Sequence, residues 1–320
     1  MRDFLPSYDN IYLRPCLSSL SHRADADTSV DFLGRKFKLP VVPANMEDVI
    51  SFDNAMYLAS NGYFYIMHRF KDAPFQFVGY AVQKNFPYIS ISIGVGEAAQ
   101  DDLERIIVTY GEVIDFLTVD VAHAHHQNVD DMMNFIRDLY DGRLKKPKII
   151  AGNVATAEGY RFLCECGVDA VKIGIGGGSI CTTRFETGFH IPTAASILDV
   201  VNEPEQWKKP IIADGGIKHH GDIAKAIALG ADMVMAGGLF ASCFDSPAKV
   251  EHGKKIYRGS TSYEAKGNGN HVEGKTLELE GDITYVKRME KIKQALCSSI
   301  SYAGGTDLKS LKRVNWHIVL

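Results

Sequence analysis

The chain has 320 residues, of which 46% are hydrophobic and 23% are charged, and its formal net charge is −4. This composition is that of an ordinary globular protein, and without a basic stripe we expect no nucleic-acid partner. No apolar run approaches the roughly 18 residues that span a bilayer, and the N-terminus has no apolar signal region. The six cysteines are scattered without zinc-type pairs. We therefore expect a cytoplasmic protein with reduced thiols and no membrane contact.

Residues 1–38 follow no regular pattern and are predicted to wrap the core as an extended segment. From residue 39 on, apolar runs of β-strand type recur at intervals of roughly 20 to 40 residues, and most are unbroken, as in parallel strands buried on both faces. They cover residues 39–43, 63–67, 88–93, 116–121, 148–151, 170–173, 210–213 and 232–236. Helix-like stretches separate them at 52–61, 74–85, 101–110, 129–140, 157–166, 191–202 and 222–229.

Eight strand–helix units in one chain predict a (β/α)8 TIM barrel of the α/β class, with a doubly wound open sheet as the alternative. We expect a single domain over residues 1–320, with the barrel core at 39–258. Residues 259–282 are rich in glycine and polar side chains and are predicted to form a mobile flap. The last helix is expected at 285–299 and a loop at 301–306, within a C-terminal part at 283–320.

Functional residues of a TIM barrel lie at the carboxyl ends of its strands. After the sixth run, four glycines within residues 174–178 lead to a lone cysteine, Cys181. A thiol on such a loop beside Arg184 is a candidate nucleophile, and Thr183 lies near enough in sequence to donate a proton to a leaving group. The alternative is a tight turn that carries an incidental thiol.

The turns after the seventh and eighth runs predict a phosphate site. Two glycine pairs, Gly215–Gly216 and Gly237–Gly238, stand where backbone N–H groups hold an anion in many barrels. Asp214 would repel a phosphate and is better suited to accept hydrogen bonds from ribose hydroxyls, so the combination predicts a nucleotide. Asp120 is expected to orient a ligand. Glu273, in the flap, is either an acid–base group that closes over the thiol or a solvated loop charge.

Two kinds of metal site can be considered. The carbonyl oxygens of Gly176, Gly178 and Cys181 form a candidate site for a monovalent cation, since hard cations take oxygen ligands, although a rigid turn would look the same. His123, His125 and His126 do not have the spacing of two ligands one helical turn apart, and no nearby carboxylate completes a set. We therefore do not expect a metal at the histidines.

Three motifs together resemble the IMP dehydrogenase/GMP reductase family: GGGSICTTR at 176–184, ADGGI at 213–217 and MAGG at 235–238. The resemblance extends from residue 12 to residue 305. Dehydrogenases of this family usually carry CBS modules between strands 2 and 3, for which residues 70–87 leave no room. They also carry an Arg-Tyr pair in the flap, and residues 259–282 contain no arginine. Arg184 and Glu273 match the reductase form.

The resemblance to the reductase branch implies NADPH-dependent reductive deamination of GMP to IMP and ammonia. Its intermediate would be a covalent thioimidate on Cys181, with Thr183 and Glu273 protonating the departing ammonia. The implied nucleotide-binding residues are Ser179, Asp214, Gly215, Gly216, Gly237, Gly238, Gly259, Ser260, Thr261 and Gly274. The implied NADPH contacts are Arg69, Asp120, Arg184, Tyr302, Gly304 and Gly305, with His22 and Arg23 reaching in from a neighbouring subunit.

The family also implies a homotetramer, and K+ is the candidate ion for the loop carbonyls of residues 176, 178 and 181. Two other functions stay open at this point. One is an IMP dehydrogenase that lacks the regulatory module, and the other is a non-catalytic nucleotide-binding barrel.

Overall fold

A parallel sheet of seven strands forms the centre of the molecule, in the order β4-β10-β9-β8-β7-β6-β5. The computed structural model describes residues 4–259 and 273–319. The strands are β4 (Val41–Pro43), β5 (Ser90–Ile93), β6 (Phe116–Asp120), β7 (Lys148–Val154), β8 (Ala170–Ile173), β9 (Ile211–Asp214) and β10 (Met233–Ala236). Nearly all of their residues are buried, as expected for strands covered on both faces. The prediction of a TIM-barrel type of α/β fold is confirmed.

The segment at 63–67 differs from its prediction as a strand. Its residues from Phe64 to Met67 are buried, but it meets β5 through one parallel bridge, between Met67 and Ile91. The reason lies in Tyr65, whose hydroxyl donates to the carbonyl of Tyr88 at 3.0 Å and accepts from the amide of Ser90 at 3.3 Å. The Tyr65 hydroxyl thus takes up the carbonyl of Tyr88 and the amide of Ser90, which a regular β-ladder would have paired with backbone groups of residues 63–67. Residues 63–67 therefore lie beside β5 as an extended segment rather than as a ladder strand.

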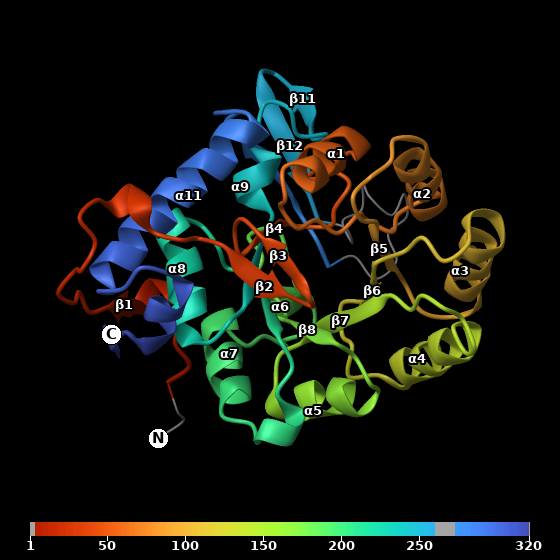
Figure 1. The fold of residues 1–320 in the computed structure, drawn as a ribbon, viewed down its shortest axis with the longest axis horizontal. Helices are drawn as coiled ribbons and strands as arrows, with labels where there is room; N and C mark the ends of the chain where they lie inside the picture. Colours follow the sequence, from red (N-terminus) through yellow and green to blue (C-terminus); the bar gives the residue numbers. More distant parts are fainter. Residues whose placement is uncertain (1–3, 260–272, 320) are drawn as a thin grey trace.

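Helices surround the sheet as a ring in chain order (Figure 1). They are α1 (Phe52–Ser60), α2 (Ala73–Gln83), α3 (Glu97–Tyr110), α4 (Gln127–Leu139), α5 (Ala157–Glu165), α7 (Thr193–Val201), α8 (His220–Leu229) and α11 (Tyr285–Tyr302). Short helices are α6 (Thr183–Glu186), α9 (Gly238–Ala241), η1 (Tyr8–Asn10), η2 (Arg23–Asp25), η3 (Glu205–Trp207) and η4 (Leu308–Arg313). Ser51, Thr156 and Thr284 cap α1, α5 and α11 by accepting a backbone N–H, which fixes where these helices begin.

The N-terminal segment does wrap the core, but it contains short strands that were not predicted. Strand β1 (Ile11–Leu13) pairs with β14 (Trp316–Ile318), and β2 (Val30–Phe32) with β3 (Arg35–Phe37) forms a hairpin. The ring of Phe37 lies 5.0 Å from that of Phe64 and 6.3 Å from that of Phe116, the first residue of β6. The hairpin, which lies over the strands in Figure 1, therefore seals the amino end of the barrel with aromatic side chains.

After β10 the chain forms a small antiparallel sheet of β11 (Lys249–Glu251), β12 (Lys254–Arg258) and β13 (Thr276–Leu279). Strand β13 lies inside the region predicted as a flap, because its backbone pairs with β12. Residues 260–272 of that region lie outside the described residues. Tyr302 was expected in a loop but ends α11, since no helix breaker precedes Gly304, which has a φ of 80°. Within 4–259 and 273–319, no helix is long and apolar enough to cross a membrane.

Candidate active site

A cavity of about 260 Å³ lies at the carboxyl ends of the strands, the end opposite the aromatic seal. It collects the segments that follow β4, β6, β8, β9 and β10, together with Asn153 near the end of β7, as the barrel topology predicts. Its lining includes the predicted residues Gly176, Gly178, Ser179, Cys181, Thr183, Asp214, Gly215, Gly216, Gly237, Gly238, Gly259 and Glu273. Most of the predicted nucleotide-binding and catalytic residues therefore meet in one place.

The loop that carries Cys181 is held by a second chain segment. The amide of Thr182 donates to the carbonyl of Glu273 at 2.8 Å, and the amide of Lys275 donates to the carbonyl of Ile180 at 2.9 Å. Cys181 and Gly274 thereby form an antiparallel bridge. Residues 273–275 are far away in the sequence, so this backbone pairing is what brings Glu273 next to the thiol.

Cys181, Thr183 and Glu273 form a continuous hydrogen-bonded chain, which we call the Cys–Thr–Glu relay. The Sγ of Cys181 donates to Oγ1 of Thr183 at 3.1 Å, and that hydroxyl donates to Oε2 of Glu273 at 2.7 Å. A thiol proton can pass through the hydroxyl to the carboxylate, and the same groups can return a proton to a leaving group. Glu273 is therefore not a solvated loop charge in this structure.

The two glycine pairs line the cavity with backbone that carries no side chain. Gly215 and Gly216 have φ angles of 93° and 82°, which side chains rarely adopt. A Cβ on Gly237 would lie 2.0 Å from the hydroxyl of Tyr257, a residue that also lines the cavity. The turns after β9 and β10 and Tyr257 of β12 therefore border the same space, and backbone N–H groups in such glycine turns are suited to an anion.

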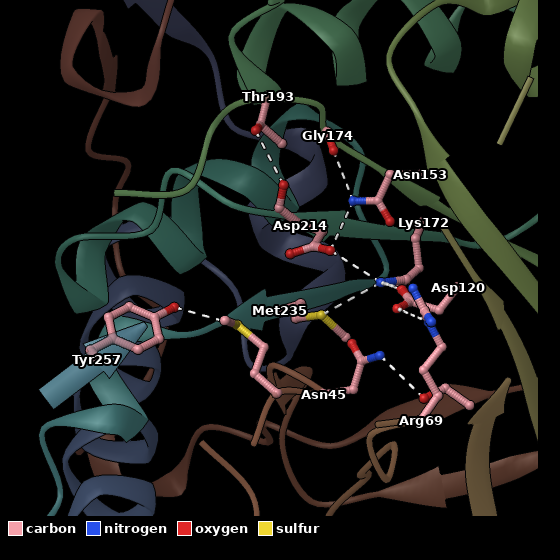
Figure 2. Close-up of polar contacts among 12 residues, drawn as sticks. Asn45, Arg69, Asp120, Asn153, Lys172, Gly174, Thr193, Asp214, Met235 and Tyr257 are labelled. Atoms are coloured by element: carbon pink, nitrogen blue, oxygen red, sulfur yellow. Dashed lines mark hydrogen bonds and ion pairs between the residues drawn. The ribbon is translucent and has the colours of Figure 1, made fainter. Parts of the chain in front are cut away.

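Behind Asp214 lies a network of charged side chains (Figure 2). Nζ of Lys172, a residue with 2% side-chain exposure, lies 2.7 Å from Oδ1 of Asp120 and 3.2 Å from Oδ2 of Asp214. Burial alone would lower the pKa of Lys172, but the two carboxylates outweigh it and raise that pKa above its usual value. Burial would raise the pKa of Asp120, but Lys172 and Arg69 together lower it. Lys172 and Asp120 are therefore held in their charged forms.

Sequence reasoning assigned no role to Lys172, Asn153 and Tyr257. Asn153 donates to Oδ2 of Asp214 at 2.9 Å and to the carbonyl of Gly174 at 2.8 Å. One signal was present for Lys172, since it is a lysine within an otherwise apolar strand, Ala170–Ile173. A buried lysine needs a carboxylate partner, and Asp120 and Asp214 end two other strands of the same sheet.

The residues predicted to contact NADPH fall into two groups. Arg69 lies 3.5 Å from Asp120 by its Nε, and the guanidinium of Arg184 lies 4.6 Å from the centre of the Phe185 ring. Neither group lines the cavity of this chain, and the second group lies further towards the chain ends. His22 and Arg23 line a separate hollow against α11, where Arg23 donates to Ser298 at 3.3 Å. Tyr302, Gly304 and Gly305 lie at the end of α11, where Gly304 approaches Cys16 and Leu17.

Three further predicted residues sit near the flap or outside the described part. Gly274 lies against Gly259. A Cβ added to Gly259 would lie 2.8 Å from the Cα of Gly274. Ser260 and Thr261 lie outside the described residues.

The rings of His123 and His125 are 6.3 Å apart. Within the described residues, no group of three or more His, Cys, Asp or Glu side chains could hold a metal ion.

Comparison with known proteins places this geometry in a family context. The profile of the IMP dehydrogenase / GMP reductase domain matches residues 6–318. The chain is 45% identical over 320 residues to a GMP reductase of Oenococcus oeni, with 98% of this chain and 96% of that protein covered. It is 42% identical over 318 residues to a GMP reductase of Staphylococcus aureus, with 98% and 95% covered.

Proposed function

This chain belongs to the IMP dehydrogenase/GMP reductase family, and we propose that it is an enzyme that converts GMP into IMP and ammonia with NADPH as the reductant. The observation that carries the proposal is the Cys–Thr–Glu relay. It supplies a nucleophile together with a group that can protonate a departing amine, and a reductive deamination needs both. The relatives named GMP reductase, which match almost the full length, support the same assignment.

The cavity supports one orientation of the nucleotide. The phosphate lies against the backbone of Gly215–Gly216 and Gly237–Gly238, with Ser179 as a further donor. Asp214 accepts from the ribose hydroxyls, because a carboxylate is an acceptor and repels the phosphate. The base is then directed towards Cys181, which lines the same cavity.

The reaction follows from what each group can donate or accept. The sulfur of Cys181 adds to C2 of the base, and its proton passes through Thr183 to Glu273. The same pair then protonates the 2-amino group, the C2–N bond breaks, and ammonia leaves a thioimidate on the sulfur. C2 next accepts a hydride, which NADPH supplies when it is bound. The C2–S bond then breaks, and IMP and the free thiolate result. Splitting one displacement into two steps lowers the barrier to each.

Two arginine side chains suit an anionic dinucleotide, which supports the choice of cofactor. Arg69, which pairs with Asp120, and Arg184, which follows Thr183 of the cavity, would hold NADPH. His22, Arg23, Tyr302, Gly304 and Gly305 do not reach the cavity of their own chain, so they would act only from a neighbouring subunit. We therefore propose a homotetramer as the active form. A K+ ion would take the carbonyl oxygens of Gly176, Gly178 and Cys181.

The test is to mix the protein with GMP and NADPH and to follow NADPH absorbance, ammonia release and IMP formation. We expect all three to proceed together in equal amounts. Reduction of NAD+ with IMP, without NADPH loss on GMP, would identify a dehydrogenase instead. Binding of GMP without either reaction would identify a non-catalytic barrel. Repeating the assay in Na+ and in K+ salts tests the cation, and sedimentation of the active protein tests the tetramer.

A further inference from the structure

The buried lysine reaches across a whole strand to meet its partner. The sheet register places Asp120 of β6, Gly152 of β7 and Lys172 of β8 in one row. A Cβ on Gly152 would lie 2.4 Å from the Cβ of Lys172. Because Gly152 has no side chain, the lysine can pass over β7 and pair with Asp120. The position of the Lys172 side chain therefore depends on a glycine at residue 152 of the neighbouring strand.

The network balances its charges inside the barrel. Two carboxylates, Asp120 and Asp214, lie among two cations, Lys172 and Arg69. Figure 2 shows that the contacts to Asp214 from Lys172 and Asn153 both go to the same oxygen, Oδ2. Within the part of the chain that the structure describes, no donor pairs with its other oxygen, Oδ1. Asp214 also lines the cavity, so this second oxygen can serve a ligand.

We propose that Lys172 is a positioning residue for the nucleotide, which holds Asp214 ready for the ribose hydroxyls and joins it to Asp120 on the side proposed for NADPH. This inference rests on the proposed function. Lys172 does not line the cavity, so it acts through the two carboxylates and touches neither ligand. Its positive charge also matters. Without it, two carboxylates would face one arginine in a site that must accept a phosphate dianion.

The test compares Lys172→Met, which keeps the length of the side chain and removes its charge, with Asp214→Asn and with the double variant. The affinity for GMP alone is measured by calorimetry, and kcat and KM by NADPH absorbance. We expect Lys172→Met to weaken GMP binding by about 30-fold or more, the usual loss when one partner of a buried charge pair is removed. The double variant should be far less impaired than the product of the two single losses.

Lys148→Met is the matched control, because Lys148 pairs with Asp169 at 3.1 Å and its side chain is 51% exposed. We expect it to bind GMP as the unaltered protein does. Equal GMP affinity in Lys172→Met and the unaltered protein would overturn the inference, as would independent losses in the double variant. If Lys172→Met does not fold, the substitution is made in an Asp120→Asn background, where one of the two carboxylates is already neutral. The GMP affinities of Asp120→Asn and of Asp120→Asn with Lys172→Met are then compared, and equal affinities would also overturn the inference.

The two proposals fail in different ways. An unaltered protein that binds GMP but never oxidises NADPH would disprove the proposed function, while the calorimetric comparison would still decide the role of Lys172. An unaltered protein that turns over GMP, with a Lys172→Met variant of unchanged GMP affinity and KM, would disprove the positioning role and leave the function standing. No binding of GMP to the unaltered protein would overturn both.

Discussion

The two ends of the barrel are built from opposite kinds of side chain. At the amino end, Phe32 and Phe37 of the β2–β3 hairpin pack on Phe64, with ring centres 5.3 and 5.0 Å away. At the carboxyl end, glycines, carboxylates and a thiol surround a cavity. Burial of aromatic surface stabilises the first end and gives it no chemistry. The second end buries Lys172 between two partly exposed carboxylates, which costs desolvation energy and gives the site its charge pattern.

The contrast between the two ends shows where stability and function can be separated. Changes at the aromatic end should reduce the free energy of unfolding and leave the activity of each folded molecule intact. Changes at the carboxyl end should do the reverse, wherever the altered atoms belong to the relay or the phosphate turns. Four experiments test this separation, in order of decreasing change.

Replacing the nucleophile should have the largest effect. Cys181→Ala is expected to lower kcat by at least about 10,000-fold, since a covalent route has no substitute for its nucleophile. The side chain is only partly buried, so the free energy of unfolding should barely change. NADPH absorbance with GMP as substrate measures kcat, and urea unfolding measures the free energy of unfolding. A Cys181→Ala protein that still released ammonia from GMP would contradict the covalent mechanism.

Removing the acid of the relay should be the next largest change. Glu273→Gln keeps the shape of the side chain but cannot take up the proton from Thr183 at 2.7 Å. We expect kcat to fall about 100- to 10,000-fold, the range of general acid–base catalysis. The control is Glu278→Gln, whose carboxylate pairs with Lys254 at 3.2 Å and is 57% exposed. Equal losses in both variants would show that the flap, rather than the relay, is at fault.

At the other end of the barrel, Phe37→Ala should cost about 3–5 kcal/mol of unfolding free energy, as expected for a large buried side chain. The ring of Phe37 also contacts those of Phe116 and Tyr88, so several elements lose packing at once. Urea unfolding measures the cost, and Phe244→Ala, at a side chain that is 61% exposed, is the control. A change in kcat per folded molecule would mean that the two ends are not separable.

The smallest expected effect concerns His68, which follows the extended segment at 63–67. Burial, opposed by Glu47 and assisted by Lys71, lowers the pKa of His68 from 6.5 to about 4. As pH falls from 6.5 towards 4, the unfolded chain takes up a proton that the folded chain does not, so stability is lost. His68→Gln should recover up to about 3 kcal/mol at pH 4 and almost nothing at pH 7. Urea unfolding at both pH values checks this, and an equal change at each would contradict it.

Much of the fold could be predicted because it depends on local patterns. Unbroken apolar runs, capping residues such as Ser51 and Thr156, and glycines after helices mark each strand–helix unit. The segment at 63–67 could not be assigned correctly, because its pairing depends on where one tyrosine hydroxyl points. Strand β13 was missed for a related reason, since its polar sequence becomes a strand by pairing with β12.

The candidate site was predictable wherever glycine and strand ends coincided, as at Gly215–Gly216 and Cys181. The contact between Glu273 and Thr183 joins residues from distant parts of the chain, and composition alone favoured a solvated Glu273. The network around Lys172 depends on the register that aligns it with Gly152, which no spacing in the sequence reveals. The register between strands and the pairing of distant segments depend on the whole fold, so the sequence pattern does not predict them.

The backbone pairing that positions Glu273 also suits residues 260–272 to replacement by other sequences. Gly259 donates to the carbonyl of Lys275 at 3.1 Å, so the two ends of the stretch 260–272 are already fastened to each other. Once the ends of a loop are fixed, each doubling of its length costs only about 0.6 kcal/mol. A protein engineer could therefore exchange or lengthen these residues, while the carboxylate of Glu273 stays where the pairing with the Cys181 segment holds it.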